Sequence, residues 1–267
     1  MTTTFYARAK RKNDTTPKLP VVRAYRLECR TNPGKVKRVA SVLFEYQMAM
    51  KIIQSNQMRA FVQGGERFWN RREPGQFTTE LSQWYKRPVQ NQIVAGLDSW
   101  LELSKAVIRD IIARSNLSDE TKTDLWWLNK CGAQYQTSKQ TTVPVWEYKD
   151  GTRVATKGRR LALPEALVLL RAITKYVRNH IVSMPQLWRS RIMMLDGTVA
   201  QVKQSAGVAH DLWVRVSTLD EGYPAWIPLG ANRFFNDASG ELSNFAQITL
   251  SGDGEVKISL VKRCEKA

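Results

Sequence analysis

Cysteine and histidine are scarce in this sequence, which limits the chemistry that it can support. The three cysteines, Cys29, Cys131 and Cys264, are far apart and form no CxxC pair. They indicate no disulfide framework and are typical of a reducing, intracellular protein. The two histidines, His180 and His210, have no cysteine pair or cluster of carboxylates beside them. We therefore expect both to be structural or surface residues rather than zinc ligands.

Catalytic and targeting motifs are also missing. The sequence has no Gly-rich phosphate loop, no GxSxG nucleophile elbow and no HExxH motif. P-loop, acyl-transfer and zinc-hydrolase functions therefore lack support. The N-terminus has no apolar stretch typical of a signal peptide. The most apolar run, over 161–170, is interrupted by Pro164 and Glu165 and is too short to span a bilayer.

Acidic residues are also few relative to basic ones. The chain has 24 Asp and Glu against 41 Lys and Arg, a formal net charge of +17 over 267 residues. Residues 1–40 hold eleven basic side chains against two acidic ones, and residues 151–203 hold ten against two, whereas the last sixty or so residues are close to neutral. Basic blocks beside a neutral one indicate a shaped surface for a polyanion. Such a surface releases counterions when it binds nucleic acid, so its affinity depends steeply on salt.

Periodicity predicts a strand followed by helices. Residues 21–30 alternate as a strand does. Asn32 and Pro33 are typical of a helix start, and the apolar residues after them recur every three or four positions. Ser118 is a suitable cap for a later helix. The other expected helices run over 88–115, 118–136 and 164–182, with a hairpin at 143–156.

From residue 191 the pattern changes to short alternating segments, which predict strands of a small barrel or sandwich. One hairpin is expected around Asp196-Gly197, and another is closed by residues 251–254. The order of elements predicts an α+β fold: a small β-barrel formed by the N-terminal strand and the C-terminal strands, with an inserted α-helical domain. The expected regions are a basic flexible arm (1–20), a first barrel strand (21–31), a helical domain (32–185) and the rest of the barrel (186–267).

Three stretches carry a resemblance to a known family. They are Arg23-Ala24-Tyr25-Arg26-Leu27 followed by Asn32-Pro33 and a long helix, Arg87-Pro88-Val89-Gln90-Asn91-Gln92 at the start of another helix, and the closing strands Ala225-Trp226-Ile227-Pro228-Leu229, Gly240-Glu241-Leu242 and Val256-Lys257-Ile258-Ser259-Leu260-Val261-Lys262-Arg263. In this order they resemble the N-terminal half of the RNA-guided nucleases, namely transposon-encoded TnpB and the type V CRISPR effectors. The similarity covers about residues 21–263 and lies in order and pattern more than in fixed letters.

The resemblance implies an OB-like wedge barrel, a helical recognition domain and a RuvC-like nuclease after the last strand. It implies that the partners are a guide RNA, the target DNA duplex, the RNA–DNA heteroduplex and, in a split effector, a separate nuclease half, with no membrane partner. The implied location is the prokaryotic cytoplasm, associated with the nucleoid. Up to Ala267 there is no candidate for the three RuvC carboxylates or for the family's CxxC zinc ribbon. We therefore expect no catalytic site, metal or cofactor in this chain, with magnesium only where a RuvC domain is present.

Three interpretations remain open at this point. In the first, the chain is a guide-RNA and target-DNA binding module that also recognises a short duplex motif beside the target. Alternatively, it is part of a complete or split RNA-guided DNA endonuclease whose RuvC half lies outside this chain. The third interpretation is a generic structured-RNA-binding protein.

Basic side chains are the first candidates for contact with nucleic acid, although each cluster could instead be a solvated surface. We expect the cationic helices to form one groove shaped to an A-form duplex. The candidates are Lys10, Arg11, Lys12, Lys35, Lys37, Arg38, Arg71, Arg72, Lys157, Arg159, Arg160, Arg171, Lys175 and Arg178.

Aromatic and amide side chains are the candidates for contact with bases. Trp69 and Trp84 lie beside basic residues and could stack on unpaired bases, although for Trp84 packing in the core is the favoured interpretation. Trp100, Trp126 and Trp127 are expected in the core. The amides that could read an adenine edge, or else cap a helix or lie on the surface, are Gln90, Asn91 and Gln92.

Overall fold

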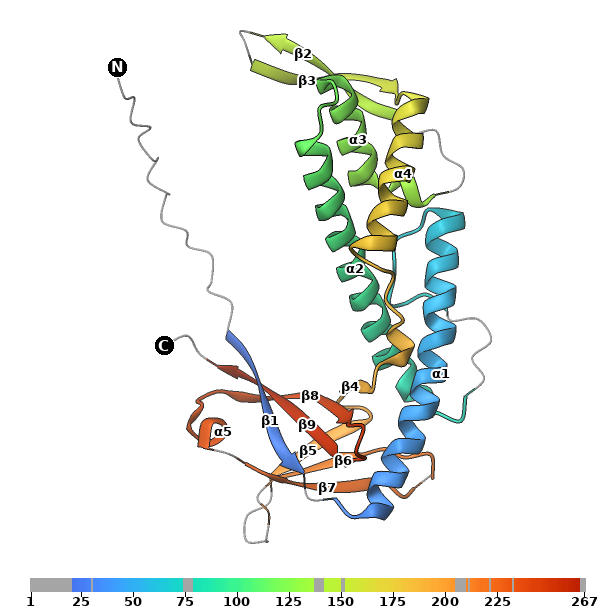
Figure 1. Ribbon diagram of the computed structural model, residues 1–267. Coiled ribbons are helices and arrows are strands. Elements are labelled where there is room, and N and C mark those ends of the chain that lie inside the picture. Colours follow the sequence, from blue (N-terminus) through green and yellow to red (C-terminus); the bar gives the residue numbers. More distant parts are fainter. Residues whose placement is uncertain are drawn as a thin grey trace, which may run out of the picture.

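The computed structural model describes residues 21–29, 31–73, 79–136, 142–149, 152–204, 210, 212–220, 222–231 and 233–264. Its architecture is α+β: a barrel-like sheet carries an arm of helices on one side (Figure 1). The predicted fold class is therefore confirmed at this level. The expected basic arm over 1–20, with Lys10, Arg11 and Lys12, lies outside the described residues.

In the described part of the chain, seven antiparallel strands form one sheet in the order β4-β8-β9-β1-β7-β6-β5. The outer strand β5 also lies beside β4 and β8, so the sheet curls until it is nearly closed. The strands are β1 (Val21–Cys29), β4 (Ile192–Asp196), β5 (Ala200–Gln204), β6 (Leu212–Val216), β7 (Ala225–Gly230), β8 (Glu241–Leu250) and β9 (Val256–Cys264).

The N-terminal strand completes the sheet, as the sequence predicts. β1 pairs with β9 from Val21 to Leu27 and with β7 at Glu28 and Cys29. Leu27 is buried. This pairing places the helical arm, in sequence, between the first strand and the other strands of the sheet.

The segment around Asp196-Gly197 forms a turn but not the predicted hairpin. The Asp196 carboxylate accepts a hydrogen bond from the Thr198 N–H at 3.0 Å, and the Asp196 carbonyl accepts one from the Val199 N–H at 3.1 Å. β4 nevertheless pairs with β8, and β5 pairs with β6. The turn therefore joins the two edges of the sheet. Turn residues specify a local reversal of the chain. Which strand each strand pairs with depends instead on burial of its apolar face.

Four helices build the arm: α1 (Pro33–Gly64), α2 (Lys86–Arg114), α3 (Asp119–Cys131) and α4 (Pro164–His180). A hairpin of β2 (Thr142–Lys149) and β3 (Thr152–Leu161) lies at the end of the arm away from the barrel (Figure 1). The short helix α5 (Arg233–Asp237) lies beside the barrel.

The helix starts follow the predicted caps. The Asn32 side chain accepts a hydrogen bond from the Lys35 N–H at 2.9 Å, and the Ser118 hydroxyl accepts one from the Thr121 N–H at 3.3 Å. α3 ends earlier than predicted because Gly132 adopts a left-handed φ of 71°. Such a glycine is a common helix terminator, and a short 3₁₀ turn follows it.

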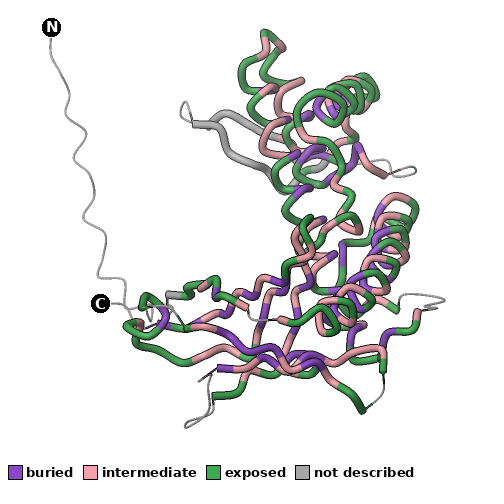
Figure 2. The backbone as a smooth tube through the Cα atoms, turned by 60° about the horizontal axis from the view of Figure 1, so that its bottom comes forward, coloured by how far each residue is buried: buried purple, intermediate pink, exposed green. Residues whose placement is uncertain are grey.

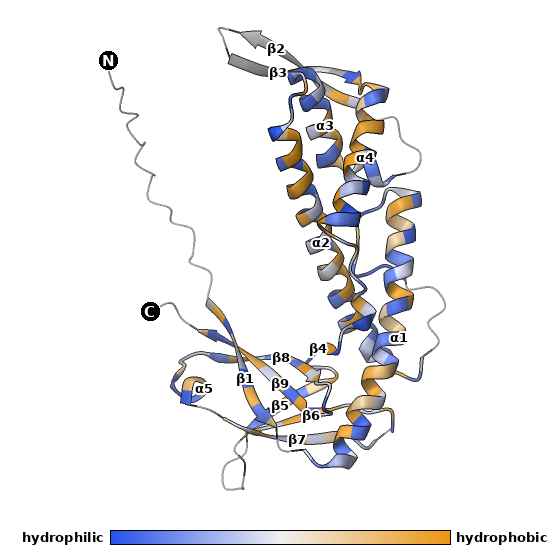
Figure 3. Cartoon of the chain, in the orientation of Figure 1, coloured by the Kyte–Doolittle hydropathy of each residue, from blue (hydrophilic) through white to orange (hydrophobic). Residues whose placement is uncertain are grey.

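Within the described part of the chain, two hydrophobic clusters stabilise the fold. The larger runs from the barrel interior, which includes Val214, Ile227 and Ile258, into the contact between α1 and α2, where Tyr46 and Ile93 are fully buried. The smaller cluster joins the C-terminal half of α2 to α3 and α4. Buried residues lie inside the barrel and between the helices (Figure 2), and hydrophobic residues alternate with hydrophilic ones around each helix (Figure 3). The base of the arm and the barrel thus share one core.

Candidate nucleic-acid interface

The first turn of α1 brings two candidate cations against the barrel. Lys35 Nζ lies 5.9 Å from the ring centroid of Trp213 on β6, and the Arg38 guanidinium donates to the Tyr223 carbonyl at 3.0 Å. Both cations are half-buried, whereas Lys37 is exposed. Lys35 and Arg38 therefore help to attach the helix to the barrel in addition to contributing charge.

Lys37 lines a cleft of about 1230 Å³ between the end of β1, the start of α1 and the β8–β9 turn. Arg26 and Lys257 face this cleft together with the carboxylates of Glu28 and Asp253. Because both signs of charge line it, the cleft does not have the uniformly positive wall expected of a phosphate channel.

Cys29 lines the same cleft. Burial raises the pKa of its thiol to about 11, so the thiol remains protonated at neutral pH and is a poor nucleophile. Among the described residues, no three His, Cys, Asp or Glu side chains are grouped as metal ligands.

The loop after α1 holds Trp69 outward on a fixed backbone. The preceding residue, Phe68, is buried and packs on Phe61 with ring centroids 4.7 Å apart. The buried Gln57 amide donates to the Trp69 carbonyl at 2.8 Å and accepts from the Trp69 N–H at 3.1 Å. The Trp69 indole itself is 46% exposed. This loop presents a solvent-facing aromatic ring without the entropy cost of ordering a flexible segment.

The two arginines of this loop have different surroundings. The Arg72 guanidinium pairs with Glu66 at 2.6 Å and donates to the Arg67 carbonyl at 3.0 Å, so its donors are used within the loop. Arg71 is exposed, as is Arg67. Arg71 therefore remains the better candidate for a phosphate contact, while Arg72 shapes the loop.

The three candidate amides are mainly structural. Gln90 is buried and donates to the Arg72 carbonyl. Gln92 accepts from the Tyr46 hydroxyl at 2.8 Å, and it joins α2 to β4 through the Ile192 carbonyl and the Met194 N–H, each at 3.0 Å. These contacts engage both amides, so they do not present the free edge that reading of adenine requires. Asn91 is exposed, and its side-chain Oδ1 accepts a hydrogen bond from Asn70 Nδ2 at 3.0 Å.

Two tryptophans differ from their expected core positions. Trp84 is 68% exposed, so the alternative of core packing is wrong for it. Trp126 is 40% exposed, with Lys130 Nζ 5.3 Å from its ring centroid, whereas Trp100 is buried as predicted. Helical periodicity identifies a face, but the length of the neighbouring helix decides how much of that face is covered.

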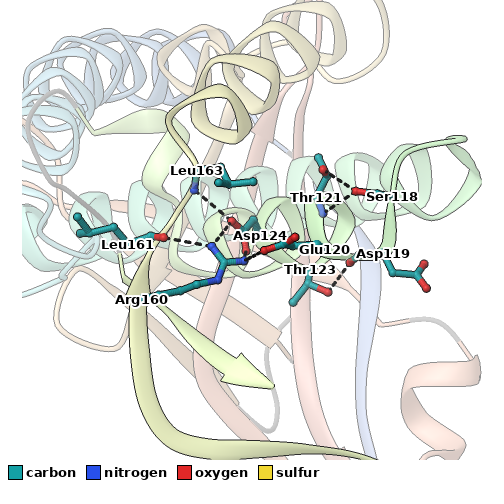
Figure 4. Close-up of polar contacts among 9 residues, drawn as sticks. All are labelled: Ser118, Asp119, Glu120, Thr121, Thr123, Asp124, Arg160, Leu161 and Leu163. Atoms are coloured by element: carbon teal, nitrogen blue, oxygen red, sulfur yellow. Dashed lines mark hydrogen bonds and ion pairs between the residues drawn. The ribbon is translucent and has the colours of Figure 1, made fainter. Parts of the chain in front are cut away.

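Arg160 is held against α3 by two carboxylates (Figure 4). Its guanidinium makes a bidentate contact with Asp124 on α3, at 2.9 and 2.6 Å, and lies 3.2 Å from Glu120. Asp124 is fully buried and also accepts from the Leu163 N–H at 3.1 Å. Asp124 therefore joins the end of β3 and the start of α4 to α3, and the charge of Arg160 is already balanced. Lys157 and Arg159 belong to β3, but their side chains lie outside the described residues.

The cations of α4 form one exposed group. Arg171, Lys175 and Arg178 are all exposed, and their spacing along the helix puts them on neighbouring turns. Arg171 also donates to the Gln136 carbonyl at 3.2 Å. Tyr176 is also exposed, but it points to another side of the helix, where its ring lies 4.9 Å from that of His180. The face that carries the three cations is therefore a basic surface.

The expected single groove is not present in the described part of the chain. Lys35 lies where α1 begins, against the barrel, whereas Arg160 belongs to β3 of the hairpin, at the opposite end of the arm (Figure 1). Lys175 is on the exposed side of α4. Cationic groups are therefore distributed over the barrel, the Trp69 loop and α4, because the long helices separate positions that are close in the predicted order of elements.

The sequence analysis missed a basic and aromatic group on the barrel. Trp213 and Arg215 on β6 alternate with the buried residues Leu212, Val214 and Val216, so they lie on the opposite face of the sheet. The alternation in this segment was visible in the sequence. Which strands would lie on either side of it was not.

The sequence matches no protein-family model and no curated protein sequence. No helix in the described residues is long and apolar enough to cross a bilayer.

Proposed function

We propose that this chain is the guide-RNA and target-DNA binding module of an RNA-guided effector of the TnpB-like or type V CRISPR class. In this proposal the barrel is an OB-like wedge domain and the arm is a recognition domain. The order of elements supports it, with one strand before the helices and the remaining barrel strands after them. The net charge of +17 supports binding to a polyanion.

The Trp69 loop carries the proposal. It presents an exposed indole beside the exposed Arg67 and Arg71, on a backbone that Gln57 fixes. An indole can stack on any base, and a guanidinium group can donate two parallel hydrogen bonds to the oxygens of one phosphate. A rigid loop with both groups is therefore suited to contact nucleic acid by shape, without reading its sequence.

Such a module does not need a sequence-reading surface of its own. In an RNA-guided complex, base pairing between guide and target supplies the sequence information, and the protein grips the backbone of the duplex. The separate basic surfaces of the barrel, the Trp69 loop and α4 would then bind different parts of one folded RNA and its paired target.

Copurifying RNA tests the proposal. The chain is expressed together with the DNA that flanks its gene, and the RNA bound to the purified protein is sequenced. We expect one defined species, bound at least about tenfold more tightly than a scrambled RNA of equal length. A heterogeneous mixture bound with equal affinity would instead identify a generic structured-RNA-binding protein.

Substitution of Arg71 localises the contact. Arg71→Glu should weaken binding of the copurified RNA by about tenfold, because it replaces a phosphate contact with repulsion. Arg233→Glu is the matched control, since Arg233 is an exposed arginine on α5, remote from the loop. Equal losses in the two variants would mean that only net charge matters and that the Trp69 loop is not a contact site.

A further inference from the structure

The outer face of β5, β6 and β7 carries a grid of aromatic and basic side chains. Across the strands, Lys203 pairs with Trp213, and Arg215 pairs with Trp226. Directly paired residues of antiparallel strands point to the same face. Because Trp213 and Arg215 are two positions apart on β6, the two indoles are diagonal neighbours with cations between them.

The rings are oriented by contacts that the structure gives. The Trp213 indole N–H donates to the His210 carbonyl at 2.9 Å, and Lys35 Nζ lies 5.9 Å from the ring centroid. Lys203 Nζ lies 5.1 Å from the ring centroid of Trp226. A lysine over an indole marks a ring face that a planar ligand can reach once the flexible lysine chain moves aside. The displaced ammonium then remains close enough to meet a phosphate.

Both indoles are half-buried, so they are supported by the sheet but not enclosed by it. The residues on their strands that point the other way, among them Val214 and Ile227, form the barrel core. The barrel interior therefore does not need these two indoles as filling. Large aromatic rings on the outside of a barrel sheet, flanked by cations, are the arrangement with which OB-type barrels bind single strands.

The charge of this face selects its occupant. Its described outward positions on β5 and β6 are Gln201, Lys203, Trp213 and Arg215, with no carboxylate among them. A polyanion with exposed rings complements that surface. The basic N-terminal segment of this chain has the same sign of charge as the face and is not complementary to it. Folded RNAs display unstacked bases in their loops, bulges and ends.

We propose that Trp213 and Trp226 form a stacking platform for unpaired bases of an RNA, with Lys35, Lys203 and Arg215 binding the adjoining phosphates. This platform rests on the proposed function, because it assigns to the barrel the single-stranded parts of the RNA that the module binds. It is distinct from the Trp69 loop and from the cations of α4, which lie on the arm.

Binding of a fluorescent oligoadenylate of about ten nucleotides to the full chain tests the platform. Trp226→Ala should weaken binding at least about fivefold, the loss expected for one stacked base. Trp226→Phe should retain most of the affinity, because it keeps an aromatic face. Trp126→Ala is the matched control, since Trp126 is a half-exposed indole on α3, and it should change the affinity less than about twofold.

A tryptophan variant could lose affinity because it unfolds, so a second variant tests the platform without touching the core. Lys203→Gln is suitable, because Lys203 is exposed and its replacement leaves the core intact. It should weaken oligoadenylate binding about two- to fivefold. Wild-type affinity in both Trp226→Ala and Lys203→Gln would overturn the platform. Tighter binding of the DNA oligonucleotide of the same sequence would overturn its assignment to RNA.

A blunt RNA duplex separates failure of the platform from failure of the proposed function. The duplex has no unpaired bases, so Trp226→Ala should leave its affinity within about twofold of wild type. Unchanged oligoadenylate binding in both Trp226→Ala and Lys203→Gln, with duplex binding retained, would reject the platform alone. No binding of either RNA by the wild-type chain would reject the proposed function and the platform together.

Discussion

Asp124 is a fully buried carboxylate on α3 whose charge is balanced by Arg160 from β3. Arg160 is about one-third exposed, so water screens part of the interaction. The Leu163 N–H also depends on this carboxylate. One side chain thus fixes the end of the β2–β3 hairpin and the start of α4 against α3. A cation that looks like a phosphate ligand in the sequence is here part of the scaffold.

Removal of the Asp124 carboxylate should be costly. Asp124→Ala removes the buried acceptor that the Arg160 guanidinium and the Leu163 N–H share, and we expect it to lower the free energy of unfolding by about 3 kcal/mol. Urea denaturation measures the loss. Glu120→Gln is the control, because Glu120 contacts the same guanidinium from an exposed position, and it should cost less than about 1 kcal/mol. Equal costs would show that burial of Asp124 is not what matters.

At the scale of elements, the arm is attached to the barrel through α2 and β4. The Gln92 amide bridges the two elements with both its oxygen and its nitrogen, and the Tyr46 hydroxyl of α1 meets the same oxygen. The Tyr46 ring is fully buried, and burial raises the pKa of its hydroxyl well above the usual range, so the hydroxyl remains a donor. Three elements therefore meet at one amide.

This junction should be sensitive to loss of the amide. Gln92→Leu removes the partners of the Ile192 carbonyl and the Met194 N–H and leaves the Tyr46 hydroxyl only its longer contact with the Met194 carbonyl, at 3.3 Å. We expect a loss of about 2 kcal/mol in the free energy of unfolding. Hydrogen exchange at Met194 should speed up in parallel. The neighbouring exposed residue gives the control: Asn91→Ala should stay within about 0.5 kcal/mol of wild type. Slow exchange at Met194 in Gln92→Leu would mean that β4 is held by its ladder with β8 alone.

At the scale of the whole molecule, positive charge is spread over a long arm and a barrel that share one core. A body of this kind can contact several segments of a folded polyanion at once, and the contacts add because each neutralised phosphate releases counterions.

Salt dependence measures this spread. The affinity for a heteroduplex of about 20 base pairs should fall by about 10³-fold or more between about 50 and 200 mM salt if six or more phosphates are neutralised. Arg71→Gln should reduce the slope of log affinity against log salt by about 1, whereas Trp226→Ala should leave it unchanged. A nearly flat dependence would contradict an interface based on phosphate contacts.

Local chemistry was enough to predict most elements. The Asn32 and Ser118 caps, the alternation over 21–30 and the proline at the start of α4 each act within a few residues, so the sequence alone located these strands and helices. The pairing of the first strand with the last ones also followed from the order of elements, because a single strand is not stable unless it pairs with other strands.

The functional surface depended on contacts that local patterns do not encode. Arg160 and Arg72 have the same side chain as Arg71, but carboxylates that fold against them take up their charge. Gln92 has the same kind of side-chain amide as Gln90 and Asn91, and only the packing of β4 beside it gives this amide its structural role. The indoles of β6 and β7 became one face only when the two strands paired in this register.

Local residue patterns account for the strands, the helices, their caps and the excess of positive charge, because each depends on the backbone preferences or the charge of nearby residues. The packing of distant segments sets which strand edges pair, which cations stay exposed and which aromatic rings share a face. Those outcomes are set by long-range burial and by the partner that each polar group finds on folding.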